Sequence, residues 1–446
     1  MPERHVADFA VKARWILPIE PAGAVLEDHA VLVRGGRILD VVPASQANAA
    51  SAEIIERPDH VLIPGLVNAH THAAMSLLRN AGGGLPLDAW LRQRIWPLEA
   101  RLVDEQFVAD GTELAVAEML LGGVTCFADM YYHPDAAARV AAQAGMRAAI
   151  GMPVLEQPSA WAQDVDEYLR RGLELSDQYR DDPLVETMFV LHSPTATSDA
   201  TLLRVRTLAD QLQAPVMTHL LESPGDRDRD RRKHGRGPLE RLEGAGLVND
   251  LLVAVHCVQA NTAELERLAA GGATVVHCPT SNLRLAAGIA PVTQMRQMGI
   301  RVALGTDGAA GNDSLDLLAE ARLAALLAAG TSGDASAIPP HDALAMATLE
   351  GARALGLADR IGSIAPGKWA DLACLALSGP RIDPCNDVAT AIVHSAGRAA
   401  VTDCWVGGRH LVAHGRLARM DTRRLAERSQ DWAPRVLAAT RAIAGQ

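Results

Sequence analysis

Aromatic residues are scarce in this chain of 446 residues, at 3% of the total, so a core must be built mainly from Ala, Leu and Val. No segment reaches the roughly 18 uninterrupted apolar residues that a membrane-spanning helix needs. The first residues, beginning Met1-Pro2-Glu3, contain no apolar signal-peptide region. The six cysteines form no Cys-x-x-Cys pair, which favours buried, reduced thiols over disulfides. Together these absences predict a cytoplasmic protein.

The chain also lacks an excess of positive charge, because its net charge is −11. A hydrophobic content of 49% and a charged content of 21% are typical of soluble globular proteins. The most charge-dense stretch, residues 226–235, mixes acids with bases and is predicted to be a solvated helix or loop. Without a basic face, we expect neither nucleic acid nor a membrane as partner, but a small molecule.

Eight short apolar runs follow one another from residue 61 onward, and stretches with helical spacing lie between them. Strands that alternate with helices pair in parallel, and eight such units over roughly 250 residues predict a (β/α)8 (TIM) barrel. A doubly wound open sheet is the alternative, but no glycine-rich fingerprint follows the first run. The runs are residues 61–67, 123–129, 146–154, 185–192, 215–219, 251–258, 273–277 and 300–305.

The two ends of the chain differ from this alternating pattern. Residues 7–42 are strand-like and contain a hairpin with Gly35 and Gly36 at its turn, and residues 404–412 repeat that pattern. Both termini are therefore expected to form one small β-sandwich. The expected domains are 1–58 (β-domain, N-terminal part), 59–361 (barrel) and 362–446 (β-domain, C-terminal part), with a helix over 421–444.

Candidate metal ligands stand at the ends of several runs. His70 and His72 close the first run, and residues i and i+2 of a strand point to the same side. His219 and Asp307 end two later runs, and in a barrel all strand ends converge. Three imidazoles and a carboxylate suit a catalytic zinc, which lowers the pKa of bound water to about 7. We expect one divalent ion here, Zn²⁺ as first choice, although iron and manganese accept the same ligands.

Two further polar residues belong to this pattern. Glu222 follows His219 by three residues and could accept a proton beside the metal, and His256 could orient or polarise a substrate. Taken singly, each histidine could be a buried structural group, and Asp307 could be an ordinary helix cap. Five such residues on five separate strand ends are hard to explain by packing, so they indicate a site.

The motifs resemble those of the amidohydrolase superfamily over essentially the whole chain. Within it, the chain is similar to the 5′-methylthioadenosine/S-adenosylhomocysteine deaminase group, whose relatives include the triazine hydrolases. The motifs are PGLVNAHTH (64–72), THLLE (218–222), HCV (256–258), HCPTSN (277–282), GTDG (305–308) and GSIAPGKWAD (362–371).

The resemblance implies a role for each matching residue. It gives one divalent ion held by His70, His72, His219 and Asp307. We also expect Asp307 to help to deprotonate the attacking water. Glu222 would shuttle protons, and His256 would contact the metal-bound water or the tetrahedral intermediate.

The same resemblance implies a substrate site. Trp90 and Glu99 would bind the nucleoside, with the carboxylate accepting hydrogen bonds from the ribose hydroxyls, and His192 would contact the purine. The alternative for Trp90 and Glu99 is an ordinary half-buried helix face.

One position departs from the group. Members that accept S-adenosylhomocysteine carry an arginine after the third strand, where this chain has Met152 and Pro153. Loss of that cation should weaken binding of an amino-acid carboxylate, whereas an apolar Met152 suits a methylthio group. The sequence thus predicts deamination of methylthioadenosine and adenosine ahead of S-adenosylhomocysteine. A hydrolase of another heterocycle (guanine, 8-oxoguanine or a triazine) and a non-catalytic scaffold are the alternatives, and similar folds suggest a homodimer.

Overall fold

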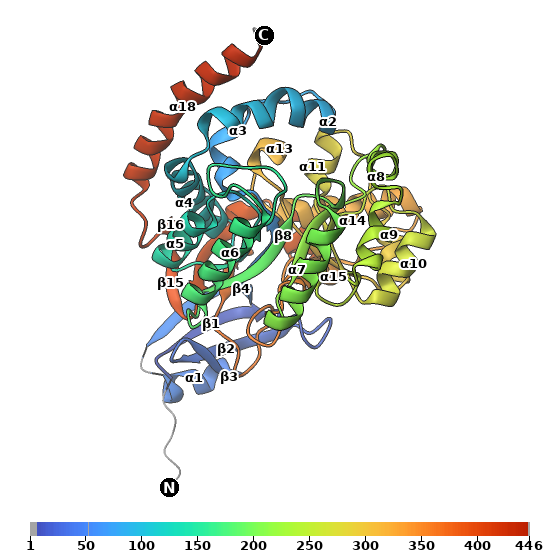
Figure 1. The fold of residues 1–446 in the computed structure, drawn as a ribbon. Coiled ribbons are helices and arrows are strands. Elements are labelled where there is room, and N and C mark those ends of the chain that lie inside the picture. Colours follow the sequence, from blue (N-terminus) through green and yellow to red (C-terminus); the bar gives the residue numbers. More distant parts are fainter. Residues whose placement is uncertain (1–6, 52, 445–446) are drawn as a thin grey trace.

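The computed structural model describes residues 7–51 and 53–444 (Figure 1). Eight parallel strands, paired in sequence order, form the predicted barrel. Beside β5, the Asp307 amide donates to the His70 carbonyl at 3.1 Å, and the Asn68 side chain bonds Thr306 twice, so the first and last strands meet. The strands are β5 (Leu66–Thr71), β6 (Val124–Asp129), β7 (Arg147–Pro153), β8 (Val185–Leu191), β9 (Val216–Leu220), β10 (Leu252–His256), β11 (Thr274–His277) and β12 (Arg301–Leu304).

Helices surround the barrel, and their ends follow local chemistry. Asp104 accepts from the Phe107 amide at the start of α4 (Glu105–Leu121), and Asn261 and Glu264 form a capping box at α10 (Thr262–Gly271). The helices that follow β6, β7 and β8 are α5 (Pro134–Ala144), α6 (Val165–Tyr179), η3 (Pro194–Ala196) and α7 (Asp199–Leu212).

The longer connections lie at the carboxyl ends of the strands. After β5 come η1 (Ala73–Leu78), α2 (Leu87–Trp90), η2 (Leu91–Ile95) and α3 (Trp96–Leu102), which we call the β5 insertion and which lies at the top of Figure 1. After β9 come α8 (Asp226–His234) and α9 (Pro238–Gly244), and after β11 come α11 (Pro279–Arg284) and α12 (Val292–Gln297). After β12 come α13 (Ala309–Asn312), α14 (Leu317–Ser332), α15 (Pro340–Met346) and α16 (Leu349–Ala354).

Both chain termini build the second sheet, as predicted. Its order is β16-β15-β14-β13-β4-β1-β2-β3, and the two predicted hairpin turns meet: a Cβ on Gly36 would lie 2.5 Å from the Gly407 oxygen. The strands are β1 (Phe9–Ile16), β2 (Leu26–Arg34), β3 (Arg37–Pro43), β4 (Ile54–Pro64), β13 (Leu372–Ala376), β14 (Val401–Val406), β15 (Arg409–Ala413) and β16 (Arg416–Leu417). The remaining helices are α1 (Ala44–Ala50), α17 (Val388–Thr390), η4 (Ala391–Ala396), η5 (Arg398–Ala400) and α18 (Thr422–Ala444).

The prediction of residues 61–67 as one barrel strand is wrong. Residues 61–64 end β4, which pairs with β1 and β13, and the barrel begins only at Leu66. The chain changes sheets at Gly65, where a Cβ would lie 2.0 Å from the Thr125 hydroxyl oxygen, so only glycine fits. The expected boundary at residues 58/59 therefore falls inside β4, and the domain limits stay a prediction.

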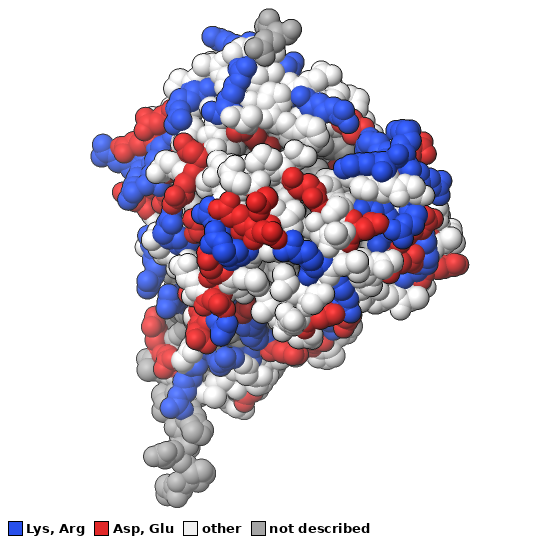
Figure 2. All heavy atoms as spheres, viewed as in Figure 1, with Lys and Arg blue, Asp and Glu red and all other residues white. Residues whose placement is uncertain are grey.

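The charge-dense segment 226–235 forms α8, but it is less solvated than its composition indicates. Asp230 is buried and pairs with the buried Arg241 at 3.1 Å, because α8 packs against neighbouring helices. Figure 2 shows basic and acidic side chains interspersed over one face of the molecule. Among residues 7–51 and 53–444, no helix is long and apolar enough to cross a membrane.

Candidate active site

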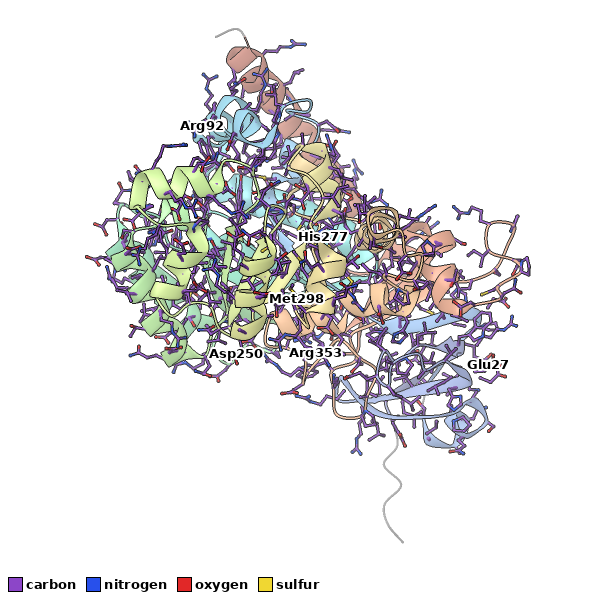
Figure 3. The ribbon with its side chains drawn as sticks, turned by 90° about the vertical axis from the view of Figure 1, so that its right-hand side faces the viewer. Glu27, Arg92, Asp250, His277, Met298 and Arg353 are labelled. Carbon is purple, nitrogen blue, oxygen red and sulfur yellow. The ribbon has the colours of Figure 1, made fainter. Side chains whose placement is uncertain are left out.

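The structure brings the four predicted metal ligands together at the carboxyl ends of β5, β9 and β12. Possible ligand atoms of His70, His72 and His219 all lie within 4.8 Å of one another. The Asp307 Oδ1 atom lies 3.6 Å from His70 Nε2 and 3.2 Å from His72 Nε2. A charged oxygen and three imidazole nitrogens facing one point make a set that could hold a divalent metal ion. In Figure 3, His277 at the end of β11 lies toward the same end of the barrel as Arg92 of the β5 insertion, whereas Asp250 and Met298 lie toward the other.

Backbone carbonyls hold the far sides of two of these imidazoles. His72 Nδ1 donates to the Met130 carbonyl at 2.5 Å, and His219 Nδ1 donates to the His192 carbonyl at 2.7 Å. These bonds place the proton on Nδ1 and leave the Nε2 lone pair free for a metal, which is the arrangement that metal-ligating histidines require. Burial lowers the pKa of both His70 and His219, which favours their neutral, ligating form.

The backbone at the site allows very close contacts. A Cβ on Gly305 would lie 2.9 Å from His70 Cβ, and one on Gly308 would lie 3.0 Å from His72 Cβ. Asp307 between them has φ of 62° and His256 has φ of 75°, both in the left-handed region that is strained for such residues. The glycines of the GTDG motif therefore let the segment that carries Asp307 pack closely against His70 and His72.

Glu222 and His256 lie together beside the four ligands. Glu222 Oε1 is 3.5 Å from His256 Nε2, and His256 stacks on the His219 ring with centroids 5.3 Å apart. Burial raises the pKa of Glu222 well above its usual value, and the nearby Asp307 charge adds to that effect. Burial lowers the pKa of His256 to about 3, so this ring is neutral. A carboxyl group that readily holds a proton beside a metal site is suited to proton transfer.

A pocket opens above these residues, with about 820 Å³ of space that includes its open mouth. The predicted substrate residues Trp90, Glu99 and His192 all line it, together with Glu222, His256 and Asp307. Leu91, Ile95, Trp96, Tyr132, Leu155 and Leu285 add apolar and aromatic walls. Most of one side comes from the β5 insertion, so the pocket is bounded by the metal site below and by helices above.

The placement of Met152 in this pocket is wrong. Its side chain is buried against α6, where a Cβ on Gly172 would lie 3.0 Å from Met152 Cβ. The neighbouring residue, Pro153, lines the pocket instead. Successive residues of a strand point to opposite faces, so an alignment that is wrong by one residue assigns the pocket to a side chain that faces away from it.

Several residues that hold the site were not predicted. Tyr131 donates to Glu99 Oε1 at 2.8 Å, and Asn282 donates to His256 Nδ1 at 2.9 Å. The Asp129 carboxylate accepts from the Ala73 amide at 2.7 Å and so fixes the segment after His72. The Ser281 hydroxyl donates to Asp307 Oδ2. Only Ser281 and Asn282 had a signal, because both lie inside the HCPTSN motif.

Comparison with known proteins places the chain in a family. The model of the amidohydrolase family matches residues 61–411. The 5-methylthioadenosine/S-adenosylhomocysteine deaminase of Teredinibacter turnerae is 42% identical over 427 residues, which cover 95% of this chain and 97% of the relative. The 5′-deoxyadenosine deaminase of Methanosarcina acetivorans is 34% identical, with 97% and 99% covered.

A solved structure agrees with these matches. The crystal structure of an adenosine deaminase from Xanthomonas campestris with bound zinc superimposes with a TM-score of 0.96 at 46% identity, covering 97% of this chain and 99% of that one. The family resemblance predicted from the motifs is confirmed. This chain belongs to the amidohydrolase family.

Proposed function

We propose that this protein is a metal-dependent deaminase of adenine nucleosides. The proposal rests on one observation above all: three of the four converging ligands, His72, His219 and Asp307, line a pocket that is also lined by two carboxyl groups, those of Glu222 and Glu99. Relatives named as deaminases of adenosine, 5′-deoxyadenosine and methylthioadenosine, at 34% to 46% identity, support the same reaction. The donor set fits one divalent ion, with Zn²⁺ as first choice.

The reaction adds water across the C6–N1 bond of adenine and then breaks the C6–amino bond, giving an inosine-type product and ammonia. An ion held by His70, His72, His219 and Asp307 would supply an activated water and positive charge. Glu222 takes a proton from the water and delivers it to N1, and its raised pKa suits it to hold that proton between the two steps. His256 faces the reacting carbon and stabilises the oxygen that becomes attached to it.

The ribose end is assigned to Glu99. Tyr131 occupies Oε1 of this buried carboxyl, so Oε2 is the freer acceptor for a ribose hydroxyl. Trp90 supplies an apolar wall beside it, and His192 lies on the purine side, next to His219 at a ring distance of 5.3 Å. A carboxylate facing a diol gives directional recognition that a free base would not receive.

The 5′ end of the substrate is expected to be uncharged. Among the described residues that line the pocket there is no lysine or arginine, and Pro153 and Leu155 occupy the side that follows β7. A free amino-acid carboxylate would therefore lose its hydration without gaining a charged partner. We accordingly rank methylthioadenosine and adenosine above S-adenosylhomocysteine. The apolar residue of β7 that lines the pocket is Pro153 and not Met152.

We place this activity in the cytoplasm. All six cysteines are free, and five of them are buried, as expected where thiols stay reduced. A homodimer that binds neither nucleic acid nor membrane remains our expectation from the charge balance and from similar folds.

The function is tested by ammonia release from a substrate panel with zinc-loaded enzyme. We expect turnover of methylthioadenosine and adenosine, less of S-adenosylhomocysteine, and little of guanine, 8-oxoguanine or a chlorotriazine. Turnover restricted to a free base or a triazine would leave the metal site in use but would refute the nucleoside assignment. Absence of turnover with the metal site filled would refute the proposal altogether.

Substrate affinity should depend on the protonation of Glu99. Burial raises its pKa to about 7, and the Tyr131 hydrogen bond opposes that rise. Below pH 7 Glu99 takes up a proton and loses an acceptor site, so KM for adenosine should rise as the pH falls. Tyr131→Phe removes the opposing hydrogen bond, so the rise should begin at higher pH, with KM about fivefold higher at pH 7.

Steady-state kinetics between pH 6 and 9 check this, with Tyr179→Phe on the far end of α6 as the matched control. With 2′,3′-dideoxyadenosine, which has no diol, wild type and Tyr131→Phe should give the same KM profile. Identical adenosine profiles for the two proteins would show that Tyr131 does not act through Glu99.

A further inference from the structure

The helix α11 touches the reacting residues with two adjacent side chains. Ser281 bonds the Asp307 carboxylate, and Asn282 bonds His256. Both side chains are at most 1% exposed, so neither can exchange its partner for water. The helix itself is held by Glu320, whose carboxylate accepts from the Thr280 amide at 3.1 Å. Two rigidly placed polar groups thus reach the site from outside the pocket.

The bond between Asn282 and His256 fixes the direction of the imidazole. Asn282 Nδ2 can only donate, so His256 Nδ1 must accept, at 2.9 Å. A neutral imidazole carries one proton, and here it must lie on Nε2. Nε2 is the nitrogen that faces Glu222 Oε1 at 3.5 Å. His256 therefore presents an N–H to the pocket and not a lone pair.

The amide orientation in the structure puts Asn282 Nδ2, and not Oδ1, against His256 Nδ1. Asn282 Oδ1 has no partner among the described residues. With the amide placed this way, a neutral His256 carries its proton on Nε2.

We propose that Asn282 is a positioning residue that keeps the proton of neutral His256 on Nε2, so that His256 meets the substrate as a hydrogen-bond donor. The assignment deepens the proposed function and rests on it for the identity of the substrate. A donor at this place stabilises the oxygen that is being attached to C6, whereas an acceptor would repel it. Among the described residues, the Asn282 side chain is hydrogen-bonded only to His256, so it acts through that ring.

The matched test is Asn282→Asp, which keeps the shape but replaces the donor with an acceptor. In zinc-loaded enzyme with ¹⁵N-labelled histidine, we expect wild-type His256 to carry its proton on Nε2 and the variant to carry it on Nδ1, with His256→Gln used to assign the signals. We expect kcat for adenosine to fall about 10²- to 10³-fold, with a much smaller change in KM. Asn261→Asp, on the exposed cap of α10, introduces the same charge and should leave kcat and the His256 signals unchanged.

Three results would overturn the assignment: a wild-type proton on Nδ1, an unchanged tautomer in Asn282→Asp, or normal kcat despite a changed tautomer. The wild-type spectrum alone decides the first, even where the variant does not fold. A wild-type proton on Nε2 in an enzyme inactive on every adenine nucleoside would support the tautomer assignment and would refute only the proposed function.

Discussion

Replacing Glu222 by Gln is expected to lower kcat for adenosine by about 10³-fold or more while the protein keeps its metal. The amide has the same shape but can neither take a proton from water nor deliver one to N1. In the structure Glu222 lies beside the four ligands, not among them, with Oε1 against His256. Loss of turnover without loss of metal would therefore identify the proton carrier.

Kinetics and metal analysis on the same sample check this prediction. Glu266→Gln is the matched control, because Glu266 is exposed on α10 and does not line the pocket. It should retain full kcat and full metal content. Near-normal turnover of Glu222→Gln with metal bound would remove Glu222 from the mechanism.

Replacing His219 by Ala is expected to abolish both metal retention and activity, with kcat/KM at least about 10⁴-fold lower. His219 Nε2 lies 3.2 Å from His70 Nε2, so it supplies one wall of the cluster. Without it three donors remain, and the cluster loses the ligand that β9 carries. Because a bound ion stabilises the folded state, Tm should also become insensitive to added zinc.

Metal content and zinc-dependent Tm shifts measure this outcome independently of turnover. His414→Ala, at an exposed turn before β16, is the control and should behave as wild type. A His219→Ala protein that keeps a stoichiometric ion and normal turnover would show that His219 is not a ligand.

The metal site could be predicted because its residues lie at the ends of strands that short apolar runs reveal in the sequence. His70 and His72 share a strand face by the two-residue repeat, and the carboxyl ends of barrel strands meet whatever the loops do. Glu222 follows His219 closely enough to reach the same point. In each case the strand end, which a short apolar run reveals, is sufficient to place the side chain.

The errors arise where one residue of register decides the outcome. Met152 and Pro153 are neighbours on β7, and only the fold decides which of them faces the pocket. Likewise, an unbroken apolar run hides the change of sheet at Gly65, because both β4 and β5 are apolar and buried there.

The residues that hold the site are the hardest to predict. Tyr131 is 32 positions from Glu99, and Asn282 is 26 positions from His256, so neither pair has a fixed spacing that sequence could show. Their contacts depend on how the β5 insertion and α11 settle over the barrel. Such tertiary contacts set the orientation of Glu99 and His256 and the position of their protons. The pattern of apolar and polar residues along the sequence does not encode these properties.

The most direct test of the central claim is a zinc titration of metal-free protein, followed by adenosine deamination. We predict that ammonia and inosine appear in equal amounts and that activity rises linearly until one ion per chain is bound, then stays constant. Full deamination by protein that is shown to contain no divalent ion would contradict the account, as would a metal-saturated protein that releases no ammonia from any adenine nucleoside.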